Sequence, residues 1–243
     1  MSPQRKAGLV EQHRLHTSTG GPQRLQRLRI TFSRGLEVKY CSHLDMMRLW
    51  ERALRRAALP LAFSEGFTPH PQLALAAPLP VGITGGGELM EVYLRKRVSP
   101  RFFLEQIMPQ LPAGIDISRV EEAPVGTPSL QSLVRMAEYL VEVECSLARQ
   151  EVEARIVELL AQERLPIERP RPSGPKALDL RALVNQVWVE SMVKGRCQLG
   201  MLLRTDPQGS GRPQEVVAAL GLGEPLSMHR VRLMLEEEDG VAP

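Results

Sequence analysis

The clearest hydrophobic pattern belongs to residues 42–57, where apolar and basic side chains separate onto opposite sides of a helix. Ser42 and Asp45 have the Ser-x-x-Asp spacing of a capping box, which predicts that the helix begins there. At 100° per residue, the apolar side chains from Met46 to Ala57 fall on one side. The opposite arc carries the basic side chains of Arg48, Arg52, Arg55 and Arg56. The pattern therefore predicts an amphipathic helix with one basic face.

Alternating apolar and polar residues around this helix predict four β-strands in the first half of the chain. Leu28, Ile30 and Phe32 alternate with polar residues, as in a strand with one buried face. Further strands are expected over residues 72–77, 88–95 and 115–121. A Ser-Pro pair at residues 99–100 predicts the start of a second, short helix. The order βαββαβ over residues 26–122 is that of a ferredoxin-like domain.

The same order of elements recurs beyond a predicted linker at residues 123–135. Alternation from Tyr139 to Cys145 predicts a strand, and apolar spacing over residues 152–160 predicts a helix. Strands are then expected over residues 178–183, 187–192, 197–203 and 229–235, with a short helix over 213–220. We therefore predict an α+β protein of two tandem ferredoxin-like (βαββαβ) domains, the second over residues 136–237 with an extra strand.

The composition is that of a folded protein and excludes several classes. Hydrophobic residues make up 43% of the 243 residues and charged residues 24%, which excludes disorder throughout the chain. Residues 1–25 and 238–243 lack an apolar period, and we expect a disordered basic segment and a flexible acidic tail there. The longest apolar stretch, residues 73–83, is shorter than the ~18 residues of a membrane span. Since the N-terminus also lacks a secretory apolar segment, we expect a cytoplasmic protein that contacts no membrane.

The cysteines predict neither disulfides nor a metal site. They stand at positions 41, 145 and 197, an odd count with wide separations that is typical of a reducing compartment. Cys145 and Cys197 lie on inward strand faces and are interpreted as small hydrophobic residues. Cys41 and His43 are two residues apart, but no further ligand pair has the spacing of a zinc finger. No cofactor is predicted, and Gly85-Gly86-Gly87 is interpreted as a flexible turn because no helix follows it.

Positive charge gathers in the first quarter of the chain. Residues 1–60 carry 12 Lys/Arg and 4 Asp/Glu, a net charge of +8, whereas the remaining residues carry 19 and 24, a net charge of −5. Such an asymmetry suggests an acidic partner, most commonly nucleic acid, and a solvated basic face with an unstructured tail is the alternative. For the arginine cluster as a group, phosphate contact is the favoured interpretation. Arginine has the planar fork that suits phosphate. The predicted phosphate contacts are Arg27, Arg29, Arg48, Arg52, Arg55 and Arg56.

A stiff loop at residues 64–71 supplies the remaining candidates. Two prolines restrict the backbone around His70, and Phe67 is available to stack on a base. Phe67 and His70 are therefore predicted to extend the nucleic-acid contact, although such loops also occur without a function. The alternative is acid–base catalysis on RNA by His43 or His70, assisted by Glu65, because imidazole titrates near neutrality. The spacing identifies no nucleophile–base pair.

The run from residue 42 to residue 83 resembles a bacterial family described as radical-SAM-linked or radical-SAM-associated proteins of unknown function. The family's Ser-His-Leu-Asp opening matches residues 42–45, and its Glu-Arg-Ala-Leu-Arg-Arg-Ala matches residues 51–57. Its Ser-Glu-Gly-Phe-Asn-Pro-x-Pro matches residues 64–71, with Thr68 where the family usually has Asn. Residues 128–134 and 176–181 are similar to its later signatures, so the resemblance spans residues 28–236.

The resemblance implies a radical SAM enzyme as partner, because members of that family are encoded beside such enzymes or fused behind them. The cluster of those enzymes needs three closely spaced cysteines, usually Cys-x3-Cys-x2-Cys, and the gaps here are 104 and 52 residues. Our first hypothesis is therefore a non-catalytic accessory module that binds RNA, or an RNA-containing complex. An RNA-processing or RNA-modifying enzyme and a protein–protein scaffold are the alternatives.

Overall fold

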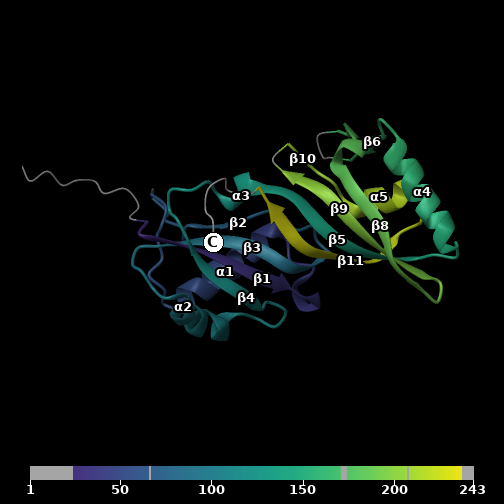
Figure 1. The fold of residues 1–243 in the computed structure, drawn as a ribbon. Coiled ribbons are helices and arrows are strands. Elements are labelled where there is room, and N and C mark those ends of the chain that lie inside the picture. Colours follow the sequence, from purple (N-terminus) through teal and green to yellow (C-terminus); the bar gives the residue numbers. More distant parts are fainter. Residues whose placement is uncertain (1–23, 66, 171–173, 207, 237–243) are drawn as a thin grey trace, which may run out of the picture.

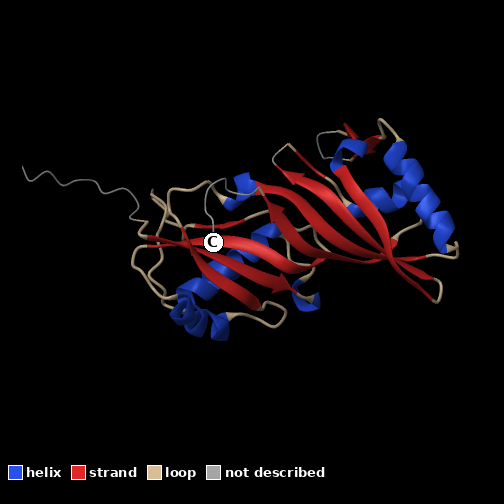
Figure 2. Ribbon diagram, in the orientation of Figure 1, coloured by secondary structure: helices blue, strands red, loops and turns tan. Residues whose placement is uncertain are grey.

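A nine-stranded, mostly antiparallel sheet runs through the computed structural model, which describes residues 24–65, 67–170, 174–206 and 208–236 (Figure 1). The strand order is β10-β9-β5-β11-β3-β1-β4, with β2 beside β3 and β8 beside β9. Helices pack on this sheet, as Figure 2 shows. The predicted α+β class is therefore confirmed. The predicted N-terminal segment, except for residues 24 and 25, and the acidic tail lie outside the described residues.

The first half contains β1, α1, β2, β3, α2 and β4 in that order. Their bounds are Gln26–Arg34, His43–Arg56, Leu73–Leu75, Thr84–Leu94, Pro100–Ile107 and Ile117–Ala123. All strand pairs within this half are antiparallel, in the order β4-β1-β3-β2. The apolar face of β1 meets α1 in a core where Phe32 and Trp50 pack edge-to-face, with ring centroids 5.0 Å apart.

The second half contains β5, α4, β6, β7, β8, β9, β10, α5 and β11. Their bounds are Val134–Glu144, Arg149–Ala161, Pro166–Arg169, Lys176–Asp179, Val184–Val193, Arg196–Asp206, Gly209–Ser210, Pro213–Ala219 and Pro225–Leu235. The main strands pair antiparallel in the order β11-β5-β9-β8. Among the four main strands of each half, the first in the chain thus lies between the third and the fourth. The strand β6 was not predicted, because a short proline-containing segment has no apolar period; it pairs with β7 in a separate hairpin.

Residues 123–135, expected to be a linker, include the end of β4, the helix α3 (Leu130–Leu133) and the start of β5. The segment is fastened to the first half by Arg27, whose guanidinium donates to the carbonyl oxygens of Thr127 at 2.8 Å and Pro124 at 3.2 Å. It therefore packs as part of the fold.

The two halves meet where β11 pairs in parallel with the start of β3, at His229 with Thr84 and Arg230 with Gly85. The glycine run that we interpreted as a flexible turn is part of β3, so that interpretation is wrong. A Cβ atom on Gly87 would lie 2.9 Å from the carbonyl oxygen of Val231, closer than side chains tolerate. The glycines thus allow β11 to approach, a requirement that becomes visible only when the second half is in place.

A buried ion pair crosses this junction. Arg230 in β11, 1% exposed, donates to both carboxylate oxygens of Glu88 in β3, and it also donates to the carbonyl oxygens of Ala77 at 3.1 Å and Pro78 at 3.2 Å. Burial acts to lower the pKa of Arg230, but the adjacent Glu88 carboxylate outweighs it and leaves that pKa above its usual range. Arg230 therefore stays charged inside the protein.

Candidate functional site

The basic helix predicted from the sequence is α1, and it begins with the predicted cap. The Ser42 Oγ accepts a hydrogen bond from the Asp45 backbone N–H at 3.2 Å, and the Asp45 carboxylate accepts one from the Ser42 N–H at 3.0 Å. The hydrogen bonds from Ser42 lower the pKa of Asp45. Met46, Trp50 and Leu54 are buried on the inner side of the helix. The cap and the apolar side together fix which face of α1 meets solvent.

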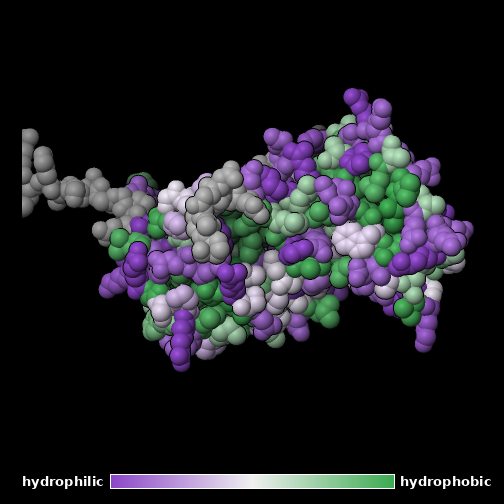
Figure 3. Space-filling model, viewed as in Figure 1, coloured by the Kyte–Doolittle hydropathy of each residue, from purple (hydrophilic) through white to green (hydrophobic). Residues whose placement is uncertain are grey.

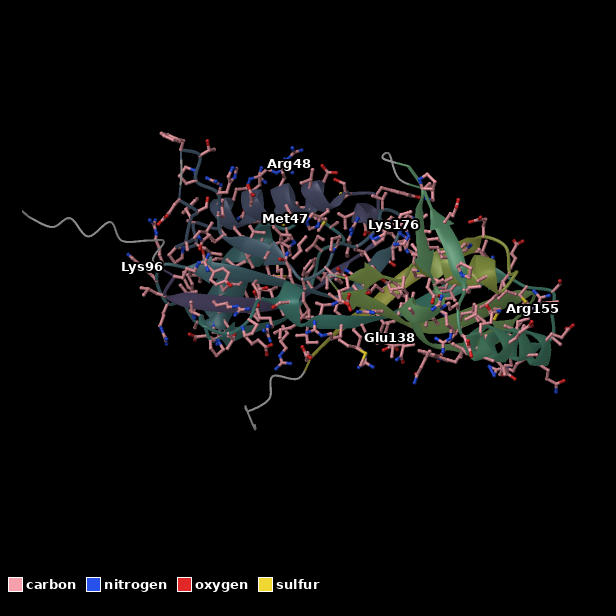
Figure 4. All side chains as sticks on the ribbon, turned by 90° about the horizontal axis from the view of Figure 1, so that it is seen from above. Met47, Arg48, Lys96, Glu138, Arg155 and Lys176 are labelled. Atoms are coloured by element: carbon pink, nitrogen blue, oxygen red, sulfur yellow. The ribbon has the colours of Figure 1, made fainter. Side chains whose placement is uncertain are left out.

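The outer side of α1 carries an arginine ridge, defined as Arg48, Arg52, Arg55 and Arg56, and all four are exposed. Figure 4 shows Arg48 projecting away from the sheet. In the part of the chain that the structure describes, no carboxylate forms an ion pair with any of them. The guanidinium of Arg55 lies 5.3 Å from the centre of the Phe63 ring. The ridge is therefore a solvent-facing row of positive charge.

A groove of about 590 Å³ runs beside the ridge, between α1 and the segment after α2. Arg52 and Arg56 lie on one wall, and Gln110, Leu111 and Pro112 belong to the other. The groove thus adds an amide and an apolar surface to two of the exposed guanidinium groups. Gln110 was missed by the sequence prediction, because it lies 54 residues after Arg56 and carries no local signal.

The loop at residues 63–71 borders the opposite side of the ridge. The Ser64 N–H donates to the His70 carbonyl at 2.8 Å, and the His70 N–H donates to the Ser64 Oγ at 3.0 Å. The His70 Nδ1 lies 3.9 Å from a carboxylate oxygen of Glu51 on α1. Phe67 is fully exposed. The structure therefore brings the loop and the basic helix together.

The two histidines proposed for acid–base catalysis are not brought together. His43 opens α1, and its Nδ1 is buried with no hydrogen-bond partner among the described residues. His70 faces Glu51, which follows His43 by eight residues, or ~12 Å along the helix. Glu65 is exposed, and no described group is bonded to it. This arrangement gives a histidine-based mechanism no support.

Arg27 and Arg29 lie apart from the ridge, because alternate residues of β1 point to opposite faces of the sheet. Arg27 is 0% exposed, and it is bound by the Glu91 carboxylate and by three carbonyl oxygens of residues 124–128. Arg29, whose side chain is 17% exposed, lies 3.6 Å from the same carboxylate. The placement of Arg27 contradicts its predicted phosphate contact, which required an exposed guanidinium.

The described residues include no group of three or more side chains that could hold a metal ion. Cys145 and Cys197 are buried, and burial raises the pKa of the Cys197 thiol. Within the described ranges, no helix has the length and apolar character needed to cross a membrane.

Residues 27–213 match the family model described as an uncharacterized protein conserved in bacteria (DUF2344). The chain belongs to this family. No match was found among curated proteins. This family assignment agrees with the bacterial family of unknown function that the sequence resembles, and it does not extend to the radical SAM association.

One solved structure shares the fold of this family member at low sequence identity, and a second matches with a lower TM-score. A chain in the crystal structure of a Cbf5–Nop10–Gar1 complex matches with a TM-score of 0.50 and 9% identity, over 87% of the present chain and 50% of that chain. An H/ACA RNP bound to a substrate RNA containing 2′-deoxyuridine matches with a TM-score of 0.45 and 11% identity, over 88% and 52%. The chain therefore spans about half the length of each of these two matched chains.

Proposed function

We propose that this chain is a cytoplasmic accessory module that binds RNA, or an RNA-containing complex, and that serves a separate radical SAM enzyme. The observation that carries the RNA contact is the arginine ridge, in which four exposed guanidinium groups stand on one helix face without an ion pair among the described residues. Like charges one turn apart on a helix repel each other. An external anion relieves this repulsion.

The chemistry of the ridge favours phosphate as that anion. Arg48, Arg52 and Arg56 follow each other at intervals of four residues, so that they rise ~6 Å per step along one side of α1. Each guanidinium offers a planar fork of donors for phosphate oxygens. Since one side of this row opens into the groove beside α1, a nucleic-acid strand has a path along the helix.

The loop at residues 63–71 adds the second part of a single-strand contact. Proteins that bind single strands combine a positive groove with aromatic side chains on which bases stack. Phe67 is fully exposed in this loop and is suited to that stacking. The open face of the sheet, where RNA-recognition motifs stack bases, is less suited, because Arg27 and Glu91 are paired and buried there.

We also propose that each half is a ferredoxin-like unit. The strand orders β4-β1-β3-β2 and β11-β5-β9-β8, with antiparallel neighbours and helices between the same strands, support this reading.

The RNA proposal predicts a salt dependence that belongs to the ridge. A single-stranded RNA oligomer should bind more weakly as salt rises, because each neutralised phosphate releases counterions. Replacing Arg48, Arg52 and Arg56 with Gln should reduce the slope of log K against log[salt] by about 2, at ~0.7 per phosphate contact. Fluorescence anisotropy over a salt series measures both quantities.

The matched control replaces Arg101, Arg119 and Arg149 with Gln. Each of these exposed arginines is already paired with a glutamate, so the control changes the net charge equally but away from the ridge. The control should retain the wild-type slope. Equal losses in both triple variants would mean that net charge alone drives binding, and the proposed site would be wrong.

The radical SAM partner is proposed from the sequence resemblance, and the cysteine spacing supports a partner because this chain lacks the usual cluster motif. Capturing partners with the tagged full chain, with and without RNase treatment, tests it. We expect a radical SAM protein to remain bound after RNase. Recovery of RNA without such a protein would contradict the partnership and leave an independent RNA-binding role.

A further inference from the structure

A cavity of about 370 Å³ lies between the two halves, away from the arginine ridge. One wall comes from the segment after β2, and the opposite wall comes from β6, β9, β10 and the start of α5. Its volume falls in the range of ~300–1,000 Å³ that is typical of small-molecule sites. The lining residues come from several distant segments, which is why the sequence contains no local signal for the cavity.

The cavity combines apolar walls with a few polar groups. Ala76, Pro80 and Val134 contribute apolar surface, and the Tyr139 side chain adds an aromatic ring. Polar groups are supplied by Gln131, Arg169, Thr205, Asp206, Ser210 and Arg212. This mixture is typical of sites that enclose an apolar body and orient it by a few hydrogen bonds.

Thr205 is the group that points to a ligand. The residue is 6% exposed, and its Oγ1 is buried without a hydrogen-bond partner among the described residues. A buried hydroxyl without a partner is unfavourable, because it has lost its water and gained nothing in exchange. A ligand that donates to or accepts from Thr205 removes this cost.

The charged groups that line the cavity are paired within the protein, so none of them requires a charged ligand. Arg169 donates to both carboxylate oxygens of Glu215, at 2.7 and 2.6 Å, and Arg212 lies 4.0 Å from the same carboxylate. Burial acts to raise the pKa of Asp206, but hydrogen bonds from Arg204, Gly209 and Gln208 outweigh it and keep that pKa below its usual value. The Asp206 carboxylate is therefore ionised at neutral pH and paired with Arg204, and it can accept a further hydrogen bond from a neutral donor.

We propose that this cavity binds a nucleobase, an uncharged flat ring whose edge carries both donors and acceptors. The apolar walls accommodate the ring. Thr205 can donate or accept, and Asp206 and the Gln131 Oε1 can accept, which matches a mixed donor–acceptor edge; the Gln131 Nε2 already donates to the Leu75 carbonyl. The base comes either from a free nucleoside or from an RNA strand, and the second source rests on the proposed function. Arg48 and Lys176, the latter next to β6, lie on the same side of the molecule in Figure 4, so a strand on the ridge has a route towards the cavity.

Calorimetric titration with adenosine, guanosine, cytidine and uridine tests the cavity directly. At least one nucleoside should bind with 1:1 stoichiometry. Gln131→Trp, which places an indole in the cavity wall, should weaken binding more than tenfold, whereas Ser132→Trp, one residue further along the same helix, should leave it unchanged. Thr205→Val should weaken binding about 3- to 10-fold, the range of one neutral hydrogen bond, without destabilising the fold.

The same variants, titrated with the RNA oligomer, separate this inference from the proposed function. Nucleoside binding without any RNA binding supports the cavity and contradicts the RNA proposal. If free nucleosides do not bind but Gln131→Trp weakens the oligomer more than Ser132→Trp does, the base comes from RNA and the cavity inference stands. If nucleosides do not bind and both tryptophan variants bind RNA like the wild type, the cavity inference is overturned and the RNA proposal survives.

Discussion

Replacing Glu88 with Ala is expected to lower the free energy of unfolding by about 3–5 kcal/mol, the usual cost of removing one partner of a buried ion pair. Arg230 would remain inside the protein without its carboxylate, and the guanidinium cannot lose its proton to escape the penalty. Because Glu88 belongs to β3 and Arg230 to β11, the loss falls on the junction between the halves. Urea denaturation followed by circular dichroism measures the change.

The neighbouring pair of Arg232 and Glu138 supplies the control. These side chains form an ion pair at 2.7 Å, but the side chain of Arg232 is 62% exposed. Hydrophilic and hydrophobic residues are interspersed on the face of the molecule that Figure 3 shows. Arg232→Ala should therefore cost less than ~1 kcal/mol, since exposed pairs contribute little. Comparable losses in the two variants would show that the pair of Glu88 and Arg230 has no special role in the junction.

The ion pair of Glu88 and Arg230 also supports one wall of the proposed nucleobase cavity. Arg230 donates to the carbonyl oxygens of Ala77 and Pro78, and both residues line the cavity. Glu88 holds Arg230 in position for these contacts. The ion pair of Glu88 and Arg230 thus fixes a wall of the cavity and also joins the two halves. A substitution that breaks this pair is therefore expected to affect both the junction and the cavity.

Much of this fold can be predicted from the sequence, because the patterns that indicate its helices and strands are local. The helix α1 has its cap, its apolar side and its arginines within 15 residues, and all three appear as predicted. Apolar and polar residues alternate regularly in strands such as β1 and β5, because alternate side chains point into the core. The loop at residues 63–71 lies beside α1 because it follows that helix closely in the chain.

What could not be predicted depends on residues that are distant in sequence. The glycines of β3 are needed because β11, more than 140 residues later, approaches their backbone. The cavity is formed by segments between residues 76 and 213. Arg27 has the sequence pattern of an exposed strand residue, yet Glu91 and residues 124–128 enclose its guanidinium. Charge alone does not distinguish an arginine that binds a partner from one that holds the fold.

Replacing Arg27 with Met tests that distinction and is expected to destabilise the protein by about 3 kcal/mol, near the lower end for a broken buried pair. Glu91 would lose its main partner, but Arg29 at 3.6 Å keeps part of the attraction, and the Met side chain fills part of the vacated space. RNA affinity, measured by anisotropy at a temperature where the variant is folded, should equal that of the wild type.

Arg48→Gln should give the opposite result. Its guanidinium is exposed on the ridge, so the free energy of unfolding should change by less than ~0.5 kcal/mol. The slope of RNA affinity against salt should fall by about 0.7, the value for one phosphate on a single strand. If Arg27→Met instead weakened RNA binding and left stability unchanged, Arg27 would belong to the interface and its enclosed position would be contradicted. The pair of variants thus separates the arginine that holds the fold from the one that we assign to the partner.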